Sequence, residues 1–405
     1  MLRALHVSNY RSLGEDVSID FSESAPHLVV LAGPNGAGKS NTLDAFRFLR
    51  DAAAPRGLAA AVQQRGGIHA VVRHGASRAH LVVEAVIGAE WVVWGVELGV
   101  WEGDDFAVWD EALFVNPSAM RDPIHARARS WVEAEGDHHV PEFARALIEA
   151  LAAHAQVAGH TLRMRVGPDV SESRRKELTV TSLRRAQSAP LYGAMCELFD
   201  AFAVYSLAPD ALRAPQIKSL DRLLADHAEN WASALLRMPI DEREELLAGL
   251  GALVPDLVDL HVESAGDYLA PVFVHRLDEG SLRVPASRES DGTLRTAAIL
   301  TALLQDPPPS LIAIEEPERA VSVRAMAVLT DYIMPRAMTT PVLLSTHSGD
   351  LLDLLPADRV CVVDRTHGRT TVRALSARQR GLVEDHVFTL GQLLLAQPLE
   401  GEPRG

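Results

Sequence analysis

Residues 28–40, with the sequence LVVLAGPNGAGKS, constrain the fold more than any other part of the chain. Five apolar residues predict a buried strand, and the residues after them complete the phosphate-loop pattern G-x-x-x-x-G-K-S. Residues 41–54 then carry apolar side chains at helical spacing, at Leu43, Phe46 and Leu49. A strand, a glycine-rich loop and a helix in this order predict an α/β fold with a phosphate-binding site at the end of a strand.

The residues of this loop have distinct predicted roles. Glycines let the backbone bend so that successive N–H groups point at phosphate oxygens, and the helix N-terminus adds partial positive charge. We expect Lys39 to reach the β- and γ-phosphates of ATP and the Ser40 hydroxyl to bind Mg²⁺. The predicted nucleotide-binding residues of the loop are Asn35, Gly36, Gly38, Lys39, Ser40 and Asn41.

Composition limits the other classes that the chain can belong to. Its 405 residues are 47% hydrophobic, which is ordinary for a globular protein of two or three lobes or of one large domain with an insertion. The chain shows no run of about 18 apolar residues, so we expect no membrane span. Residues 1–7 read as a strand and lack a signal-peptide pattern, and Cys196 and Cys361 are simplest as reduced thiols. These features predict a cytoplasmic protein.

The net charge of −15 argues against a surface coated for nucleic acid, because DNA-binding proteins usually carry a basic domain. Two short basic groups, at residues 174–176 and 184–185, are the candidates for a local DNA-binding patch. A solvated helical face is the simpler interpretation of both groups.

The pattern along the chain predicts a nucleotide-binding head interrupted by an insertion. Residues 1–104 read as the N-terminal part of the head, and residues 105–260 as a mainly helical insertion. Residues 261–399 alternate helix and strand as a parallel core does, and residues 400–405 read as a disordered tail. The helices expected in the insertion are residues 140–156, 191–204 and 219–238.

Two further apolar strands end in polar residues. Residues 311–314 run into the acidic sequence EEPE, which is a Walker B pattern with Glu where Asp is commoner. We predict that Glu315 holds the Mg²⁺ shell and that Glu316 polarises the attacking water as general base. Residues 341–344 run into STHS, which puts His347 at a strand tip where it can contact the γ-phosphate. With Lys39, Glu316 and His347 form the predicted catalytic set.

A third motif, SDGTLR at residues 290–295, precedes the Walker B pattern by about twenty residues. Ser290 and Gly292 stand at the start of an expected helix, where backbone N–H groups can bind an anion. An ordinary N-cap turn is the alternative interpretation.

The order of these motifs resembles that of ABC-type ATPases of the RecF/SMC-like branch. More narrowly, it resembles the stand-alone bacterial AAA-family ATPases related to the ATPase half of OLD-family nucleases. The opening sequence NYRS at residues 9–12 is similar to that group's start, and residues 388–394 to its ending. The resemblance implies a P-loop NTPase of the ABC-ATPase head type, with a mixed sheet core and a mainly helical insertion.

The resemblance also implies a mechanism. Two heads pair head-to-tail with two ATP molecules between them, so that Ser290 and Gly292 of one subunit cap the γ-phosphate bound by the other. Arg11 resembles a residue that approaches the nucleotide in this branch. The segment RAVSV at residues 319–323 departs from the group's pattern, which affects a region that lies near the partner subunit.

Several functions remain open on the sequence. The leading hypothesis is an ATPase whose ATP-dependent homodimer, or higher oligomer, regulates a separate effector protein, such as a nuclease in anti-phage defence. We expect no nuclease in this chain, because no Asp-x-Asp follows His347. The alternatives are an ATP-gated DNA clamp in repair, a transporter subunit, which the NYRS start disfavours, and a nucleotide sensor with slow turnover.

Overall fold

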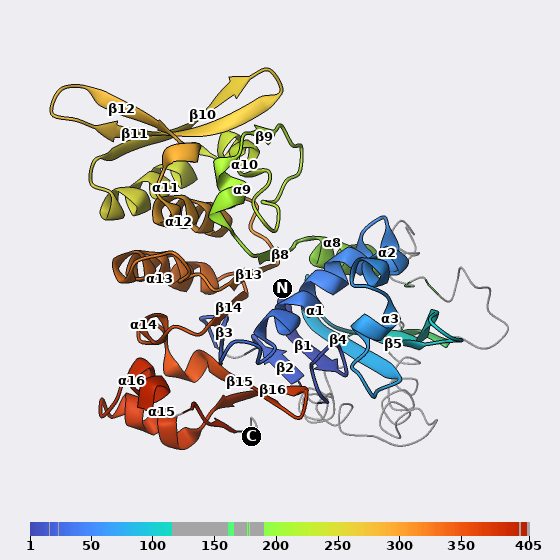
Figure 1. Cartoon of the computed structure of the whole chain (residues 1–405). Helices are drawn as coiled ribbons and strands as arrows, with labels where there is room; N and C mark the ends of the chain where they lie inside the picture. Colours follow the sequence, from blue (N-terminus) through green and yellow to red (C-terminus); the bar gives the residue numbers. More distant parts are fainter. Residues whose placement is uncertain are drawn as a thin grey trace. The chain divides into compact units, whose positions relative to one another are not determined.

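The computed structural model describes residues 1–15, 17–22, 24–115, 161–165, 176, 178, 190–396 and 398–402. The chain divides into two compact units, each made of segments that are distant in sequence. Unit 1 comprises Met1–Glu23, Pro34–Asp200 and Val363–Arg373, and unit 2 comprises Ser24–Gly33, Ala201–Val362 and Ala374–Gly405. Most of their elements are labelled in Figure 1.

Unit 1 is built on an antiparallel sheet with the strand order β2-β1-β4-β5-β6-β7. These strands are β1 (Leu2–Ser8), β2 (Val17–Asp20), β4 (Arg78–Ile87), β5 (Glu90–Val100), β6 (Phe106–Val115) and β7 (Thr161–Arg165). Within its described residues, the helices of this unit are α1 (Lys39–Ala53), α2 (Gly57–Gln64), α3 (Ile68–Val71) and α8 (Pro190–Asp200). Helix α1 packs against α2 and α8, and it buries the predicted stripe of Leu43, Phe46 and Leu49.

Unit 2 contains most of a sheet with the order β17-β16-β15-β3-β14-β13-β8. Its strands are β3 (Leu28–Ala32), β8 (Phe202–Tyr205), β13 (Leu311–Glu315), β14 (Val342–Thr346), β15 (Val360–Thr366), β16 (Arg369–Leu375) and β17 (Gly401–Glu402). Strands β15, β3, β14, β13 and β8 run parallel, whereas β16 and β17 pair antiparallel. The chain leaves unit 2 within β15 and returns to it within β16. This mixed sheet confirms the predicted α/β class.

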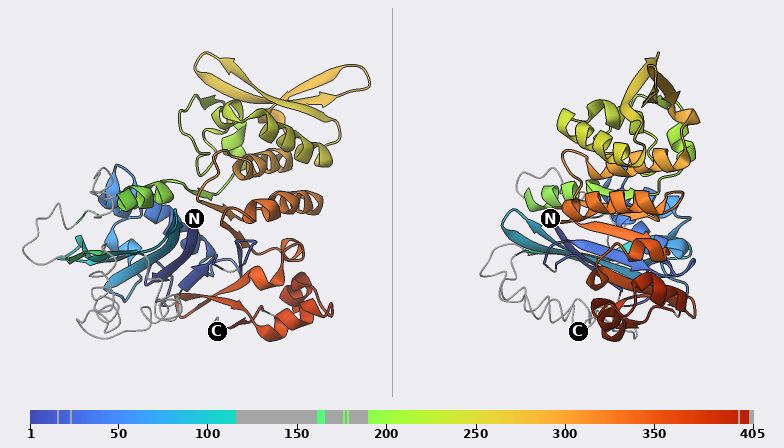
Figure 2. Two further views of the ribbon diagram at one scale, coloured as in Figure 1. Left: turned by 180° about the vertical axis from the view of Figure 1, so that it is seen from behind. Right: turned by 90° about the vertical axis from the view of Figure 1, so that its left-hand side faces the viewer.

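The central strands are buried on both faces, which explains their continuous apolar sequences. The helices of unit 2 are α9 (Pro209–Arg213), α10 (Trp231–Arg237), α11 (Ile240–Leu253), α12 (Asp291–Leu303), α13 (Val323–Ala337), α14 (Gly349–Leu352), α15 (Ala377–Glu384) and α16 (Leu390–Ala396). A small antiparallel sheet of β10 (Leu257–Ala265), β11 (Tyr268–Arg276) and β12 (Ser281–Pro285), with β9 (Gln216–Ile217) paired to β11, covers α10 and α11 (Figure 2). Two short 3₁₀ turns are Ala286–Arg288 and Ala357–Arg359.

Three expectations from the sequence differ from the structure. The helix expected at residues 191–204 ends at Asp200, because the apolar residues after it form β8 beside β13. The helix expected at residues 219–238 is limited to α10, and Asn230 holds the turn before it with hydrogen bonds to Leu223 O and Ala225 N. In the expected tail, Gly401–Glu402 forms β17 against β16.

The predicted insertion, residues 105–260, includes strands as well as helices. It contains β6 of the unit 1 sheet and β8 of the parallel sheet, along with α8 to α11. The helix expected at residues 140–156 lies outside the described residues, as do Arg174, Arg175, Arg184 and Arg185 of the basic groups. Lys176, which is described, pairs with Asp105 at 2.8 Å. Among the described residues, no helix combines the length and the apolar character that crossing a membrane requires.

Candidate functional site

The phosphate loop starts at the end of β3 and leads directly into α1. Its glycines Gly36 and Gly38 have φ angles of 78° and 112°, a region that favours glycine. Lys39 is the first residue of α1, and its buried side chain donates a hydrogen bond from Nζ to Pro34 O at 3.1 Å. The loop therefore folds back over its own lysine, as a phosphate cradle requires.

A chain of hydrogen bonds supports this loop from the side of the opening motif. The Thr370 hydroxyl, on β16, donates to Ala37 O at 2.7 Å and lies 2.8 Å from Ser12 Oγ. Asn41 Nδ2 donates in turn to Ser12 Oγ at 2.6 Å. Ser12 of the NYRS sequence therefore supports the phosphate loop. Asn41, which was predicted to bind nucleotide, takes part in the same series of hydrogen bonds.

Gly38→Ala is expected to weaken ATP binding about tenfold or more. A Cβ at Gly38 would lie 2.2 Å from Thr370 Oγ1, and the positive φ adds strain of about 1–3 kcal/mol. Titration with a fluorescent ATP analogue measures the effect. The matched control is Gly57→Ala, which has φ +70° but open space around the new Cβ. Equal affinities for Gly38→Ala and the wild type would contradict the prediction.

Tyr10 and Arg11 of the opening motif converge on one carboxylate of α1. Tyr10 Oη and Arg11 Nη1 both donate to Asp44 Oδ2 at 2.6 Å, and Arg65 donates from Nη2 to Asp44 Oδ1 at 3.0 Å. Arg65 also stacks over the ring of Phe48, with 5.0 Å from Cζ to the ring centroid. Arg11 was predicted to approach the nucleotide, and in this structure its guanidinium is paired with Asp44. A role for Arg11 toward the nucleotide stays a prediction.

The charges around Asp44 set its protonation. Burial alone would raise the pKa of Asp44, but the hydrogen bonds and charges of Arg65, with Tyr10 and Arg11, hold it below its ordinary value. Burial and the neighbouring Asp44 carboxylate raise the pKa of Tyr10, so its hydroxyl remains a donor. No sequence motif marks Asp44 or Arg65, because neither residue belongs to the nucleotide-binding pattern.

In unit 2 the parallel register places the ends of β13, β14 and β3 at one edge of the sheet. In the strand register, Glu315 lies opposite Ser345, and Thr346 lies opposite Ala32, the last residue of β3. Gly33 N, directly after β3, donates to Thr346 O at 3.4 Å. The first glycine of the phosphate-loop pattern and the two polar strand tips are therefore neighbours.

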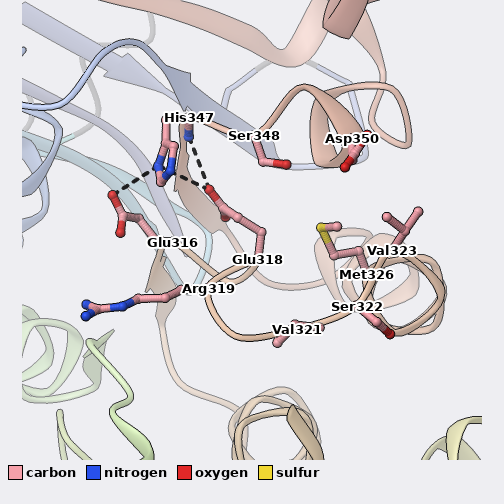
Figure 3. A pocket seen from close by; sticks show the side chains of 10 residues that line it. All are labelled: Glu316, Glu318, Arg319, Val321, Ser322, Val323, Met326, His347, Ser348 and Asp350. Carbon is pink, nitrogen blue, oxygen red and sulfur yellow. Dashed lines mark hydrogen bonds and ion pairs between the residues drawn. The ribbon is translucent and has the colours of Figure 1, made fainter. Parts of the chain in front are cut away.

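Glu316 and His347 lie together at this edge (Figure 3), and their catalytic roles stay a prediction. His347 Nδ1 is 3.3 Å from Glu316 Oε1 and 3.6 Å from Glu318 Oε1. The Oε1 atom of Glu318 also accepts hydrogen bonds from Thr346 Oγ1 at 2.7 Å and from His347 N at 3.2 Å. Glu318 therefore positions the histidine, a role that the sequence analysis missed although Glu318 closes the EEPE motif.

These residues line one wall of an open pocket of about 600 Å³. Its lining residues are Glu316, Glu318, Arg319, Val321, Ser322, Val323, Met326, His347, Ser348 and Asp350 (Figure 3). Among the described residues, no group of three His, Cys, Asp or Glu side chains is arranged to hold a metal ion. Proteins usually bind Mg²⁺ through one or two oxygen ligands plus substrate phosphates and water. The Ser40 hydroxyl and the Glu315 carboxylate are donors of that kind.

The SDGTLR motif forms the start of α12. Ser290 is its N-cap, and the Ser290 Oγ atom accepts a hydrogen bond from Thr293 N at 3.1 Å. Asp291 pairs with Arg213. A Cβ at Gly292 would lie 3.1 Å from Ala320 O, so the turn lies against the segment that follows the Walker B strand. The N-cap turn is thus present, and binding of an anion by the turn stays a prediction.

Residues 28–353 match the family model described as "AAA domain, putative AbiEii toxin, Type IV TA system". This chain belongs to that family of AAA-type ATPase domains. The matched range includes the phosphate loop and the ends of β13 and β14, whereas Tyr10, Arg11, Ser12 and Thr370 lie outside it. No curated protein matches the chain.

The AAA domain also resembles solved SMC head domains. An SMC head bound to the C-winged helix domain of ScpA has a TM-score of 0.51 and 13% identity, covering 93% of this chain and 98% of that one. An SMC head with an extended coiled coil, bound to the C-terminal domain of ScpA derived from Pyrococcus furiosus, has a TM-score of 0.49, 14% identity and 95% and 99% coverage. The SMC head domain from Thermotoga maritima has a TM-score of 0.45 and 11% identity, and the match covers 93% of this chain and 99% of that one. At these identities the first similarity supports the fold alone.

Proposed function

We propose that this AAA domain hydrolyses ATP with Glu316 as the general base. The observation that carries the proposal is the pair of Glu316 and His347 at 3.3 Å, located at the sheet edge where the phosphate-loop pattern begins. The left-handed glycines and the buried Lys39 support nucleotide binding by the loop that follows β3. A carboxylate at this position accepts the proton of the attacking water.

The roles of the other residues follow from their contacts. The backbone N–H of His347 donates to Glu318, which holds the residue in place. The His347 ring is therefore available to orient Glu316 and to donate to a γ-phosphate oxygen. Lys39 places positive charge within the loop that binds the phosphates. Ser40 and Glu315 would hold Mg²⁺, which would supply positive charge to the β- and γ-phosphates.

The proposal extends to a composite site formed by two copies of the domain. Ser290 and Asp291 are exposed at the N-terminus of α12, a helix of 13 residues, and a partner's bound nucleotide can reach them. In this arrangement Ser290 and Gly292 of one subunit cap the γ-phosphate of the other. ATP then drives association, and hydrolysis releases it.

The partner that this cycle controls is proposed from resemblance. The motif order supports a place near the RecF/SMC-like branch and the ATPase half of OLD-family nucleases, hence a separate nuclease-type effector in anti-phage defence. The similar SMC head is described as bound to a domain of ScpA, which supports the idea that a head of this fold carries a protein partner. An ATP-gated DNA clamp predicts instead DNA binding that falls steeply with salt.

Lys39→Met is expected to lower ATP hydrolysis about 10²-fold or more, because a charge that stabilises the transferring phosphoryl group is lost. Phosphate release with ATP and Mg²⁺ measures the rate, and light scattering with and without ATP measures the mass. Lys218→Met is the matched control, since Lys218 is exposed and distant in sequence from the motifs. Equal rates for Lys39→Met and the wild type would rule out hydrolysis at this loop.

A further inference from the structure

Arg295, the last residue of the SDGTLR motif, is buried in unit 2, with only 3% of its surface exposed. Its Nη2 atom donates to Glu316 O at 2.7 Å and to Glu315 O at 3.1 Å. Its Nη1 atom donates to Leu207 O. One guanidinium on α12 therefore holds the backbone at the end of the Walker B strand.

The backbone at Glu316 is in an unusual conformation. Its φ angle is 46°, in the left-handed region, which costs a non-glycine residue about 1–2 kcal/mol. Such a conformation persists where the surrounding structure fixes it. The Glu316 N–H donates to Ser345 O at 3.0 Å, and its carbonyl accepts from Arg295. Both peptide groups of Glu316 are thereby fixed, and the side chain is directed at His347.

A second contact joins the same two segments. The Cα of Gly292 lies so close to Ala320 O that a Cβ would be 3.1 Å from it. The segment of residues 290–295 therefore contacts the chain on both sides of Glu318. Arg295 binds Glu315 and Glu316, and Gly292 lies against Ala320. A displacement of this turn must move the backbone that carries Glu316.

We propose that Arg295 is a positioning residue that holds Glu316 in its reactive orientation and couples the turn of residues 290–295 to the general base. The inference rests on the proposed function, since it assigns a part to Arg295 in that hydrolysis. Lysine cannot replace Arg295 fully, because a single ammonium does not present the planar fork that reaches three carbonyl oxygens.

The first test is kinetic. Arg295→Lys is expected to lower kcat about 10–100-fold with KM for ATP within about twofold, since a displacement of about 1 Å at a reacting group costs that much. The kcat of Arg295→Gln is expected to be lower still, so that lysine at this position partly restores the rate. In the Glu316→Gln background, Arg295→Lys is expected to change kcat less than twofold, because Arg295 acts through Glu316.

Thr301→Val on the same helix controls for lost stability. Thr301 Oγ1 accepts from Trp231 Nε1 at 3.0 Å and donates to Ala297 O at 2.8 Å, away from the Walker B segment. This variant is expected to lower the unfolding temperature while kcat stays within about twofold. Two results would overturn the inference. One is an unchanged kcat in Arg295→Lys, and the other is an equal fold-loss of kcat from Arg295→Lys in the wild-type and Glu316→Gln backgrounds.

The second test does not depend on hydrolysis. The ring signal of His347 in ¹³C-histidine-labelled protein, assigned by its loss in His347→Gln, reports the position of the Glu316 carboxylate. Arg295→Lys is expected to move this signal toward its position in Glu316→Gln, and an unmoved signal contradicts the inference. If wild-type protein shows no ATP hydrolysis, the proposed function fails, and the signal alone decides whether Arg295 positions Glu316.

Discussion

Glu316→Gln is expected to lower kcat for ATP hydrolysis by about 10²–10⁴-fold, the usual contribution of a general base, while ATP still binds. Glutamine preserves the shape of the side chain and its contact with His347, but it does not accept a proton from water. In the composite-site model the variant also holds the ATP-bound dimer, because the step that releases it is blocked. Phosphate release gives the rate, and light scattering with ATP and Mg²⁺ gives the mass.

Asp350→Asn provides the matched control for this prediction. Asp350 is an exposed carboxylate of the same pocket, on the wall opposite His347 and Glu316 in Figure 3. Its kcat is expected to stay within about twofold of the wild type. Two outcomes would contradict the role of Glu316: a rate in Glu316→Gln close to that of the wild type, or an equal loss in Asp350→Asn.

Asp44→Asn is expected to lower the free energy of unfolding by about 3–5 kcal/mol, the usual cost of removing one partner from a buried ion pair. The change leaves Arg65, whose side chain is 6% exposed, without the carboxylate that it contacts at 3.0 Å. Urea unfolding at neutral pH measures the loss. Asp51→Asn is the control, because Asp51 also contacts Arg65 but is more exposed, so we expect a smaller loss.

The same carboxylate gives a pH dependence of known sign. The pKa of Asp44 is lower in the folded protein than its ordinary value of 3.8. Its contribution to stability is therefore complete above about pH 4 to 5 and is lost as the pH falls through the lower, folded value. The acid decline in stability is expected to be less steep in Asp44→Asn than in the wild type. Identical declines would show that Asp44 is not the group responsible.

Motifs that occupy neighbouring positions in the sequence were predictable, because their geometry is local. The phosphate loop, the Walker B strand and the strand before His347 each contain their own strand signal and polar tip, and parallel pairing then brings the tips together. The burial of α1 followed from the helical spacing of its apolar residues. Such patterns need no knowledge of the rest of the fold.

Contacts between distant residues were not predictable in this way. Thr370 supports Ala37 across more than 300 positions, and no pattern marks that threonine. Arg295 stood in a recognised motif, yet its bonds to Glu315 and Glu316 depend on the fold that brings α12 to the end of β13. The four apolar residues of β8 fit helix and strand equally well, and their pairing with β13 decides between the two.

The position of β3 in its sheet has a consequence for how the protein is made. Leu28 pairs with Val342, so one neighbour of β3 leaves the ribosome about 310 residues after β3 itself. At about 5–20 residues per second, this apolar strand waits roughly 15–60 s for that partner. During this interval its unpaired edges can pair with other nascent chains, so we expect the yield of folded protein to depend on a chaperone. If translation stops before Val342, β3 stays unpaired, and we expect the truncated chain to be degraded.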